Sequence, residues 1–511
     1  MSKKKKHASK RSKRKVIKRK RRLKNYPKTP RVVPGGLHVI DNIPNTISEY
    51  ESVEEEAQAR QDAAEEQIKL FRNILPRLLK RLERIKDPRN PKKLTHKLTV
   101  LLLYGIFSFV YQMTSRRDAN RSMSKPQFKE NLNAAFPELE SLPHNDTLNR
   151  VLSSIDVEEI EQTYIELIQR FIRKKKFVRY LVDNRYLIAI DGTRKLTRNE
   201  CWAEECLEQT RTRKNKDGTT EEYKQFYVYV LEACLVFPGG MRIPLLSEFL
   251  TAQDGDVTRD KQDCELNAFK RLAKQLKQYF PRLPIRLLLD GLYPSGPVFE
   301  LCQKYNWQFM IVLKDKSLSS VWEQAEELDA YNHQSTQQRW GDREQLFRWV
   351  NEIYYEYSKD NRRKMQVLHL VVCDEQWQEY DREGNELTKQ SHHAWLSSET
   401  ICKENVHSLC NLSARTRWAI ENNILVEKHH GYQYEHLFSE NWNAMKGYHY
   451  LMHIGHFLNV ITRFSQRLAP LAKQKSVRNF IQFLRDSFAH PWLDKERLAA
   501  LVPQTYQIRL I

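Results

Sequence analysis

Two apolar runs that end in the same dipeptide constrain the fold of this chain more than any other feature. Residues 188–191 read Ile-Ala-Ile-Asp, residues 287–290 read Leu-Leu-Leu-Asp, and a glycine follows each aspartate. Short runs of this kind are typical of strands buried on both faces of a sheet. A carboxylate at the carboxyl end of such a strand lies at the sheet edge where α/β proteins place their sites. The pattern therefore predicts two buried strands that end in Asp191 and Asp290.

The surrounding segments predict an α/β fold with a mixed sheet and flanking helices. Strand-like runs at 186–190, 226–237, 243–250, 285–289 and 309–313 are accompanied by helix-like stretches at 264–280 and 296–305. This alternation indicates crossover helices. Residues 317–400 differ, because they hold five of the ten tryptophans, strand-like runs at 345–357, 366–373 and 393–396, and a turn at 381–385. They predict a β-rich insertion in the sheet domain.

A third acidic residue lies in a helical pattern near the C-terminus. At 100° per residue, Glu421 lies about 40° from Arg417, and Lys428 lies about 20° from Glu421. The three side chains therefore form one stripe, which suits a face that binds a metal through the acid and phosphates through the cations. A solvated helix face with an i,i+4 ion pair is the alternative. Trp418 and Leu425 form the adjacent stripe, and we expect them to pack inward.

The two aspartates indicate a metal site more strongly together than either does alone. Carboxylates on neighbouring strands repel each other unless a cation lies between them, and hard oxygen ligands favour Mg²⁺ or Mn²⁺. For either aspartate alone, a turn or a helix cap is an equal explanation. Asp254, Asp256 and Asp263 offer further carboxylates, but they fall in a predicted loop and are expected to be turn residues.

The positive charge of the chain is concentrated at its beginning. The formal net charge is +21, and residues 1–31 hold seventeen Lys or Arg and no acidic residue, which leaves +4 for the other 480 residues. A run of like charges cannot pack, so it predicts a disordered arm that can bind phosphates. A solubility or targeting tail explains the arm equally well. The charge favours a polyanionic partner without identifying a reaction.

The apolar segments and the cysteines predict a cytoplasmic protein without a membrane partner. The longest apolar stretch, 98–113, is shorter than the roughly 20 residues that cross a bilayer, so it predicts a buried core helix. No apolar segment follows the basic N-terminus, as a signal peptide would require. The eight cysteines include no CxxC pair and predict reduced thiols.

The order Asp191, Asp290 and Glu421 resembles that of the DDE transposases of bacterial insertion sequences, whose catalytic domain is ribonuclease-H-like. In one superfamily of these enzymes, the glutamate belongs to a pattern of Tyr, two residues, Arg, three residues, Glu, six residues and Lys. Arg417, Glu421 and Lys428 match it, and Ala414 stands at the Tyr position. The resemblance covers about 187–456, and the family also carries a β-rich insertion between the second aspartate and the glutamate.

The resemblance implies a chemistry and a set of partners. Asp191, Asp290 and Glu421 would bind two Mg²⁺ or Mn²⁺ ions and catalyse DNA cleavage and strand transfer, while Arg417 and Lys428 would bind DNA phosphates. The expected partner is double-stranded DNA, both terminal inverted repeats and target, bound by a homodimer. No small-molecule cofactor is expected. A tryptophan of the insertion is a candidate for stacking on a displaced base.

Six segments follow from these patterns. They are a disordered polybasic arm and linker (1–45), a helical DNA-binding domain (46–180), a first part of the ribonuclease-H-like catalytic domain (181–316), the β-rich insertion (317–400), a second catalytic part with the Glu421 helix (401–475) and a C-terminal helical segment (476–511).

Three other functions remain open from the sequence. A ribonuclease-H-like nuclease without strand transfer would use the same three acids. A catalytically silent nucleic-acid-binding protein would keep the fold alone, and an RNA- or ribosome-associated protein would depend on the arm.

Overall fold

The structure, a computed structural model, describes residues 49–139, 141–214, 219–252, 261–359, 361–380 and 386–511. The predicted arm and linker, the turn at 381–385, Asp254 and Asp256 lie outside these residues. The chain divides into two compact units, residues 1–56 and residues 57–511. Apart from the first residues of α2, the elements below belong to the second unit.

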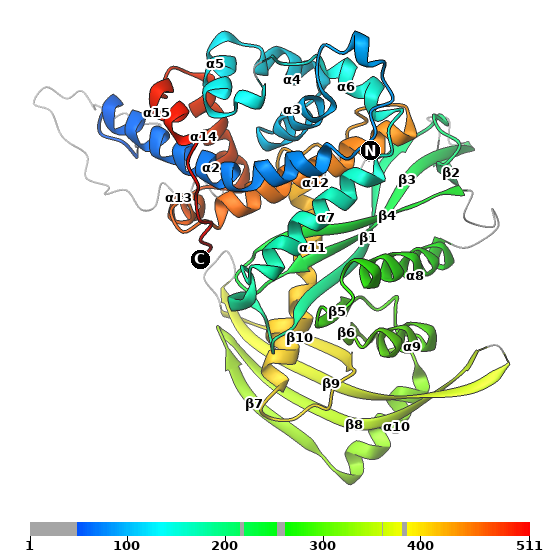
Figure 1. Cartoon of the computed structure of the whole chain (residues 1–511). Helices are drawn as coiled ribbons and strands as arrows, with labels where there is room; N and C mark the ends of the chain where they lie inside the picture. Colours follow the sequence, from blue (N-terminus) through cyan, green and yellow to red (C-terminus); the bar gives the residue numbers. More distant parts are fainter. Residues whose placement is uncertain (1–48, 140, 215–218, 253–260, 360, 381–385) are drawn as a thin grey trace, which may run out of the picture. The chain divides into compact units, whose positions relative to one another are not determined.

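The described residues up to Tyr180 are helical, as the sequence predicts. Its helices are α2 (Val53–Leu82), α3 (Leu98–Val110), α4 (Arg116–Met123), α5 (Pro126–Ala135), α6 (Asn145–Leu152) and α7 (Glu158–Arg173). Helix α3 is the predicted core helix, and it lies against α12 (Trp442–Arg463) in Figure 1. Gly455 permits this approach, because a Cβ there would lie 2.8 Å from the Cβ of Phe109. Among the described residues, no helix has the length and apolarity to cross a membrane.

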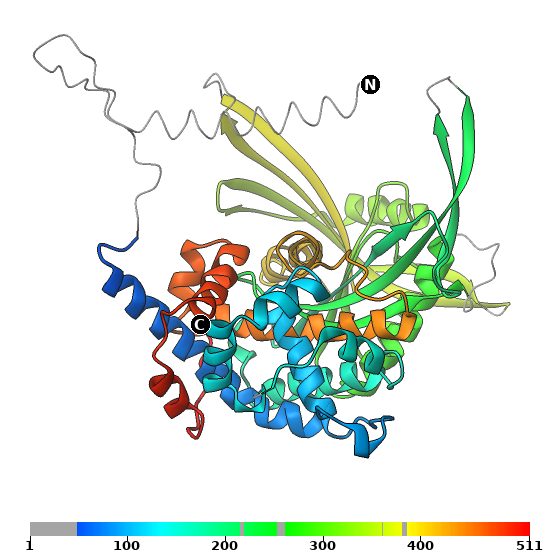
Figure 2. The same cartoon turned by 90° about the horizontal axis from the view of Figure 1, so that it is seen from above.

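Ten strands of the described residues form one mixed sheet. They are β1 (Tyr186–Arg198), β2 (Leu207–Lys214), β3 (Thr220–Val236), β4 (Arg242–Leu250), β5 (Ile285–Leu289), β6 (Gln308–Val312), β7 (Gln334–Trp340), β8 (Arg343–Lys359), β9 (Arg362–Tyr380) and β10 (Glu386–Ser397). Their order is β2-β3-β1-β5-β6-β10-β9-β8-β7, and β4 also pairs with β3. The strands of the predicted insertion, β7 to β10, therefore extend the same sheet beyond β6 (Figures 1 and 2).

Helices cover both faces of the sheet near β1. Helix α8 (Lys261–Tyr279) connects β4 with β5, and α9 (Gly296–Tyr305) connects β5 with the parallel strand β6. On β3, Tyr229 hydrogen-bonds to Glu265 of α8, whereas Glu232, three residues further on, faces His449 of α12. Because side chains alternate along a strand, α8 and α12 lie on opposite faces.

The C-terminal part returns to the helical layer. A π-helical turn, η5 (Ser408–Ser413), and a 3₁₀ turn, η6 (Ala414–Arg417), lead into α11 (Trp418–His429). Helices α12, α13 (Ala469–Gln474), α14 (Val477–Ala489) and α15 (Lys495–Leu501) follow.

The structure corrects the sequence prediction at Asp191, at Asp263 and in three further elements. Asp263, expected to be a turn residue in a loop, lies within helix α8. Strand β1 continues to Arg198, so Asp191 lies within a strand rather than at its end, because β3 is long enough to pair with β1 through Arg198. Strands β2 and β7 and helix α10 (Ser319–Tyr331) were not predicted. The two strands are mostly polar, so they show no apolar alternation, and pairing with β3 and β8 holds them in place.

A buried arginine connects the two halves of the sheet domain. Arg286 of β5 donates to Asp183, which precedes β1, at 2.9 Å and to Glu399, which follows β10, at 2.7 Å. It also donates to Ser413 Oγ of η5 at 2.7 Å. One guanidinium thus joins segments that are separated in sequence by the whole insertion.

Replacing Arg286 by Met should lower the free energy of unfolding by about 3 kcal/mol, the low end for a broken buried ion pair. The low end applies because Asp183 and Glu399 are 41% and 30% exposed and can turn to water. Urea denaturation of the full chain measures the change, with the exposed Arg282→Met as control. Equal midpoints for the two variants would contradict the role of Arg286.

Candidate active site

The parallel pairing of β1 with β5 sets the position of both aspartates. Ala189 is the register partner of Leu288. Asp191 lies two residues after Ala189, and Asp290 lies two residues after Leu288. Asp191 and Asp290 therefore lie at the same level on neighbouring strands. The Asp191 Oδ1 accepts from Gly192 N at 3.0 Å, and the Asp290 Oδ1 accepts from Leu292 N at 2.9 Å. Each carboxylate is thus oriented by its own backbone.

The third acid and its arginine come from the junction of η6 and α11. Arg417, which is mostly buried, donates from Nη2 to Glu421 Oε1 at 3.0 Å, and its guanidinium lies 4.6 Å from the ring centroid of Trp418. Glu421 falls in the first turn of α11, where the helix dipole favours a negative charge. The predicted i,i+4 pair is present, and it lies beside the aspartates rather than on a remote face.

The electrostatics of Asp191 show that these groups are close together. Burial, together with repulsion from Asp290 and Glu421, raises the pKa of Asp191 to about 6, and the nearby Arg417 opposes this shift. Three carboxylates and one guanidinium lie close together, so this partly buried cluster holds more negative than positive charge. Oxygen ligands with excess negative charge are the donor set that Mg²⁺ and Mn²⁺ prefer, so the residues fit the expected ions.

Lys428, the remaining residue of the predicted stripe, is engaged elsewhere. Its Nζ donates to the Arg194 carbonyl at 2.9 Å and lies 3.0 Å from Glu435 Oε1. Its described contacts therefore tie α11 to β1, and the structure does not bring it into the carboxylate cluster. Ala414 is buried, so the position expected to hold Tyr offers no polar group to the site.

The glycines after both aspartates make room for neighbouring side chains that the sequence did not reveal. A Cβ at Gly192 would lie 2.3 Å from the Tyr229 hydroxyl oxygen, and one at Gly291 would lie 2.6 Å from Cε of Lys314. Tyr229 and Tyr293 donate to the two oxygens of the buried Glu265, at 2.7 and 3.2 Å. Glu265 of α8 and these two tyrosines thus form a second layer that supports the strand ends carrying Asp191 and Asp290.

The expectation that Trp418 and Leu425 pack inward is wrong. They are 55% and 47% exposed, because α11 packs on the sheet through Ala419, Ile420 and Ile424. Trp418 lines a cavity of about 420 Å³ together with Arg415 and, from the β7–β8 turn, Trp340 and Arg343. The cavity therefore places two indole rings close to the Glu421 helix.

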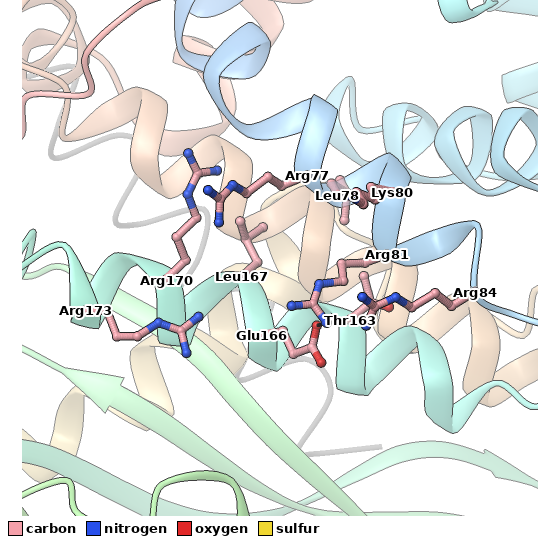
Figure 3. A pocket seen from close by; sticks show the side chains of 10 residues that line it. All are labelled: Arg77, Leu78, Lys80, Arg81, Arg84, Thr163, Glu166, Leu167, Arg170 and Arg173. Atoms are coloured by element: carbon pink, nitrogen blue, oxygen red, sulfur yellow. Dashed lines mark ion pairs between the residues drawn. The ribbon is translucent and has the colours of Figure 1, made fainter.

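A separate pocket of about 350 Å³ between α2 and α7 is lined by cations (Figure 3). Its charged residues are Arg77, Lys80, Arg81, Arg84, Arg170 and Arg173, with Glu166 as the acid, paired to Arg81. Arg77 and Arg170 point toward each other, and Figure 3 draws no acid between them. Burial, followed by repulsion from Arg77, lowers the pKa of Arg170.

Comparison with known proteins gives one family match. Residues 79–168, from the end of α2 into α7, match the family model described as DDE_Tnp_1-associated, which supports a DDE-type transposase. Among solved structures, the piggyBac transposase synaptic complex with hairpin DNA is similar over 86% of this chain and 84% of that chain, at 12% identity and a TM-score of 0.37. A TM-score this low does not establish a shared fold. No curated protein matches the chain.

Asp191→Asn should stabilise the metal-free protein at pH 8 by on the order of 1–3 kcal/mol and leave its stability near pH 3.5 unchanged. Because burial raises the pKa of the folded-state carboxyl to about 6 from 3.8, the wild type loses stability as the pH rises between these values. Thermal unfolding over pH, with the exposed Asp315→Asn as control, measures the difference. Mg²⁺ or Mn²⁺ should stabilise the wild type at pH 8 more than Asp191→Asn; an equal response would contradict a metal site at Asp191.

Proposed function

We propose that the chain is a DNA transposase that cleaves DNA at the ends of its element and transfers the strands to a target. The observation that carries this proposal is the convergence of Asp191, Asp290 and Glu421 from two parallel strands and a later helix. The family match over residues 79–168 supports it independently, because it falls outside the carboxylate site. The mixed sheet, with crossover helices and a β-rich extension, is consistent with a ribonuclease-H-like domain.

In this proposal the three carboxylates hold two Mg²⁺ or Mn²⁺ ions. When bound, these ions supply activation of the attacking water or 3′-hydroxyl and stabilisation of the leaving oxygen. Arg417 keeps Glu421 oriented through its 3.0 Å hydrogen bond and, beside the acids, offers positive charge to a DNA phosphate. Lys428 contributes by holding α11 against β1, and reaches a phosphate only if DNA displaces Glu435.

The same proposal includes the compartment, the DNA partner and the oligomeric state of the protein. The protein acts in the cytoplasm on the inverted repeats of a bacterial insertion sequence and pairs two ends as a homodimer on DNA. Trp340 and Trp418 are suited to stacking on a displaced base, because both line the cavity next to α11 and Trp418 is exposed. Of these two rings, Trp340 lies in the predicted insertion.

The variants Asp191→Asn, Asp290→Asn and Glu421→Gln should each reduce DNA cleavage and strand transfer by about 100-fold or more, because each removes an anionic metal ligand. The donor plasmid would carry the DNA that flanks the gene as transposon ends, and a second plasmid would serve as target. Binding to the ends should persist in all three variants, and Asp315→Asn should keep full activity.

The same assay separates the other functions. Cleavage without joined product, under conditions in which a control transposase joins strands, would identify a nuclease. End binding by a wild-type chain that neither cuts nor joins would identify a silent binding protein.

The cationic pocket between α2 and α7 gives the helical domain a specific place to bind DNA. Six Lys or Arg side chains face one acid there, and Arg77 and Arg170 repel each other. A phosphate group between them would relieve this repulsion and accept hydrogen bonds from both guanidiniums. The pocket therefore supports a backbone contact that positions DNA without reading its sequence.

Arg77→Glu combined with Arg170→Glu should weaken binding to duplex DNA about 10–100-fold and reduce the salt dependence by about one counterion, because the contact to one phosphate is lost. Affinity measured across a range of salt concentrations tests both effects. Lys403→Glu with Lys473→Glu makes the same change of charge at exposed positions elsewhere. If this control lowers affinity and salt slope equally, the pocket has no specific role.

A further inference from the structure

A buried carboxylate of the insertion contacts the segment that leads into α11. Glu375 of β9 is 3% exposed, and its oxygens accept hydrogen bonds from the insertion and from η6. Within the insertion, the donors are Gln345 of β8 at 2.9 Å, Ser391 of β10 at 2.7 Å and Arg343 of β8. From η6, Arg415 Nη2 donates at 2.6 Å. Glu375 therefore joins three strands of the insertion to the turn before the Glu421 helix.

Arg415 is fixed in position by more than this ion pair. Its Nε donates to Asn411 Oδ1 of η5 at 3.1 Å, and Asn411 Nδ2 donates to Gln345 Oε1 at 2.9 Å. The guanidinium also lies 5.2 Å from the ring centroid of Trp340 and 5.7 Å from that of Trp395. Because a guanidinium donates only in its own plane, these contacts fix its orientation as well as its place. The insertion thus holds η6 through directional contacts.

The position of Arg415 affects where α11 begins. The turn η6 continues directly into α11, and Arg417, two residues after Arg415, donates to Glu421. Ile420 and Ile424 pack α11 on the sheet, but apolar contacts are non-directional and by themselves do not fix the rotation of a helix. A directional contact just before the first turn of α11 restricts that rotation. The place of Glu421 relative to β1 therefore depends in part on β9.

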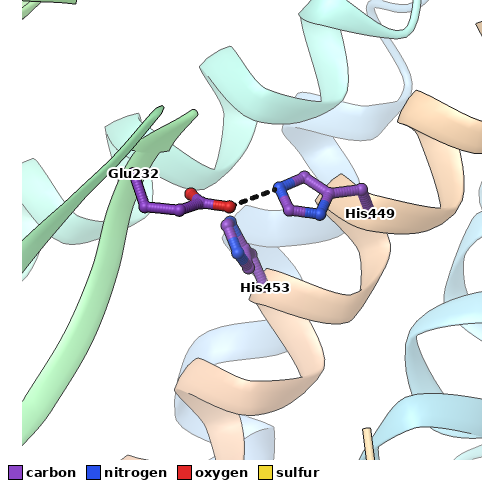
Figure 4. Close-up of side chains that lie close together, drawn as sticks. All are labelled: Glu232, His449 and His453. Carbon is purple, nitrogen blue, oxygen red and sulfur yellow. Dashed lines mark ion pairs between the residues drawn. The ribbon is translucent and has the colours of Figure 1, made fainter. Parts of the chain in front are cut away.

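The charge state of Glu375 suits this role, as a comparison with Glu232 of β3 shows. Burial, with repulsion from a neighbouring glutamate, raises the pKa of Glu232 to about 7, and Figure 4 shows its carboxylate beside two histidine rings. Burial also acts to raise the pKa of Glu375, but hydrogen bonds from Gln345 and Ser391 and the two arginines outweigh it and lower that pKa to about 2. Glu375 is therefore ionised at neutral pH, and its attraction for Arg415 persists.

We infer that Glu375 is a positioning residue for the candidate active site, which acts through Arg415 to hold Glu421 at the level of Asp191 and Asp290. The inference rests on the proposed function, because it assigns the three carboxylates to one metal site. It gives the β-rich insertion a part in the reaction that requires no contact between the insertion and DNA.

Mn²⁺ binding to the DNA-free full chain, followed by electron paramagnetic resonance, tests the inference without requiring activity. Asp191→Asn identifies the binding that belongs to the carboxylate site. Glu375→Gln should weaken that binding about 10–100-fold, the range for loss of a group that orients a metal ligand. Asp374→Asn makes the same carboxylate-to-amide change on the other face of β9. It should bind Mn²⁺ as the wild type does, because Asp374 is 40% exposed and pairs with Arg348.

DNA cleavage provides a second readout. Glu375→Gln should cut the donor plasmid more slowly at limiting Mn²⁺ and approach the wild-type rate at saturating Mn²⁺, with unchanged affinity for the transposon ends. A merely structural role would instead lower cleavage at every Mn²⁺ concentration. Circular dichroism identifies a variant that fails to fold. In that event Arg415→Lys, which keeps the charge but loses the planar fork that reaches both Glu375 and Asn411, should show the same shift in Mn²⁺ affinity.

The outcomes separate this inference from the proposed function. Equal Mn²⁺ affinities of Glu375→Gln and the wild type, or an equal loss in Asp374→Asn, would overturn the positioning role and leave the proposed function standing. A wild-type chain that binds Mn²⁺ at the carboxylate site but cuts no DNA would contradict the proposed function. The Mn²⁺ affinity of Glu375→Gln would still decide the role of Glu375.

Discussion

The buried guanidinium of Arg286 is the contact on which the geometry of the acidic site depends. It lies on β5, four residues before Asp290, and its partners precede β1, follow β10 and precede the Glu421 helix. Four further strands lie between β6 and α11 in the sequence, so no local contact brings α11 back to β1. Two ion pairs and a hydroxyl provide that link, because the Nη groups of a buried guanidinium need acceptors in the plane of its fork.

The acidic site is held together by opposing forces. Parallel pairing in register places Asp191 and Asp290 at one level, and their repulsion, together with burial, raises the pKa of Asp191. Arg417 offsets part of this repulsion and is itself held by Glu421 and the Trp418 ring. The folded protein thus tolerates an unfavourable concentration of negative charge. Such strain is typical of functional sites, since a purely structural cluster would be better served by apolar side chains.

The sequence was sufficient for those parts of the fold and site that depend on local pattern. The apolar runs before Asp191 and Asp290 and the spacing of Arg417 and Glu421 each survive in the structure, because each is a property of one strand or one helix. What it could not supply depends on contacts between residues far apart in the sequence: the hydrogen bond of Lys428 to the Arg194 carbonyl of β1, and the packing of α11 that leaves Trp418 exposed. The polar strands β2 and β7 were missed for the same reason, since a neighbouring strand stabilises them.

The histidines of α12 are a further case in which the sequence does not reveal the contacts that the fold creates. The series His449, His453 and His456 is visible in the sequence, but on one helix it is equally compatible with a satisfied core. Only the fold places Glu232 of β3 and Glu427 of α11 against it. Glu427 lies on the helix of Glu421, and Glu232 is the register partner of Asp191 on the adjacent strand. The buried charges therefore lie beside the acidic site, on the strand that pairs with β1 and on the helix that carries Glu421.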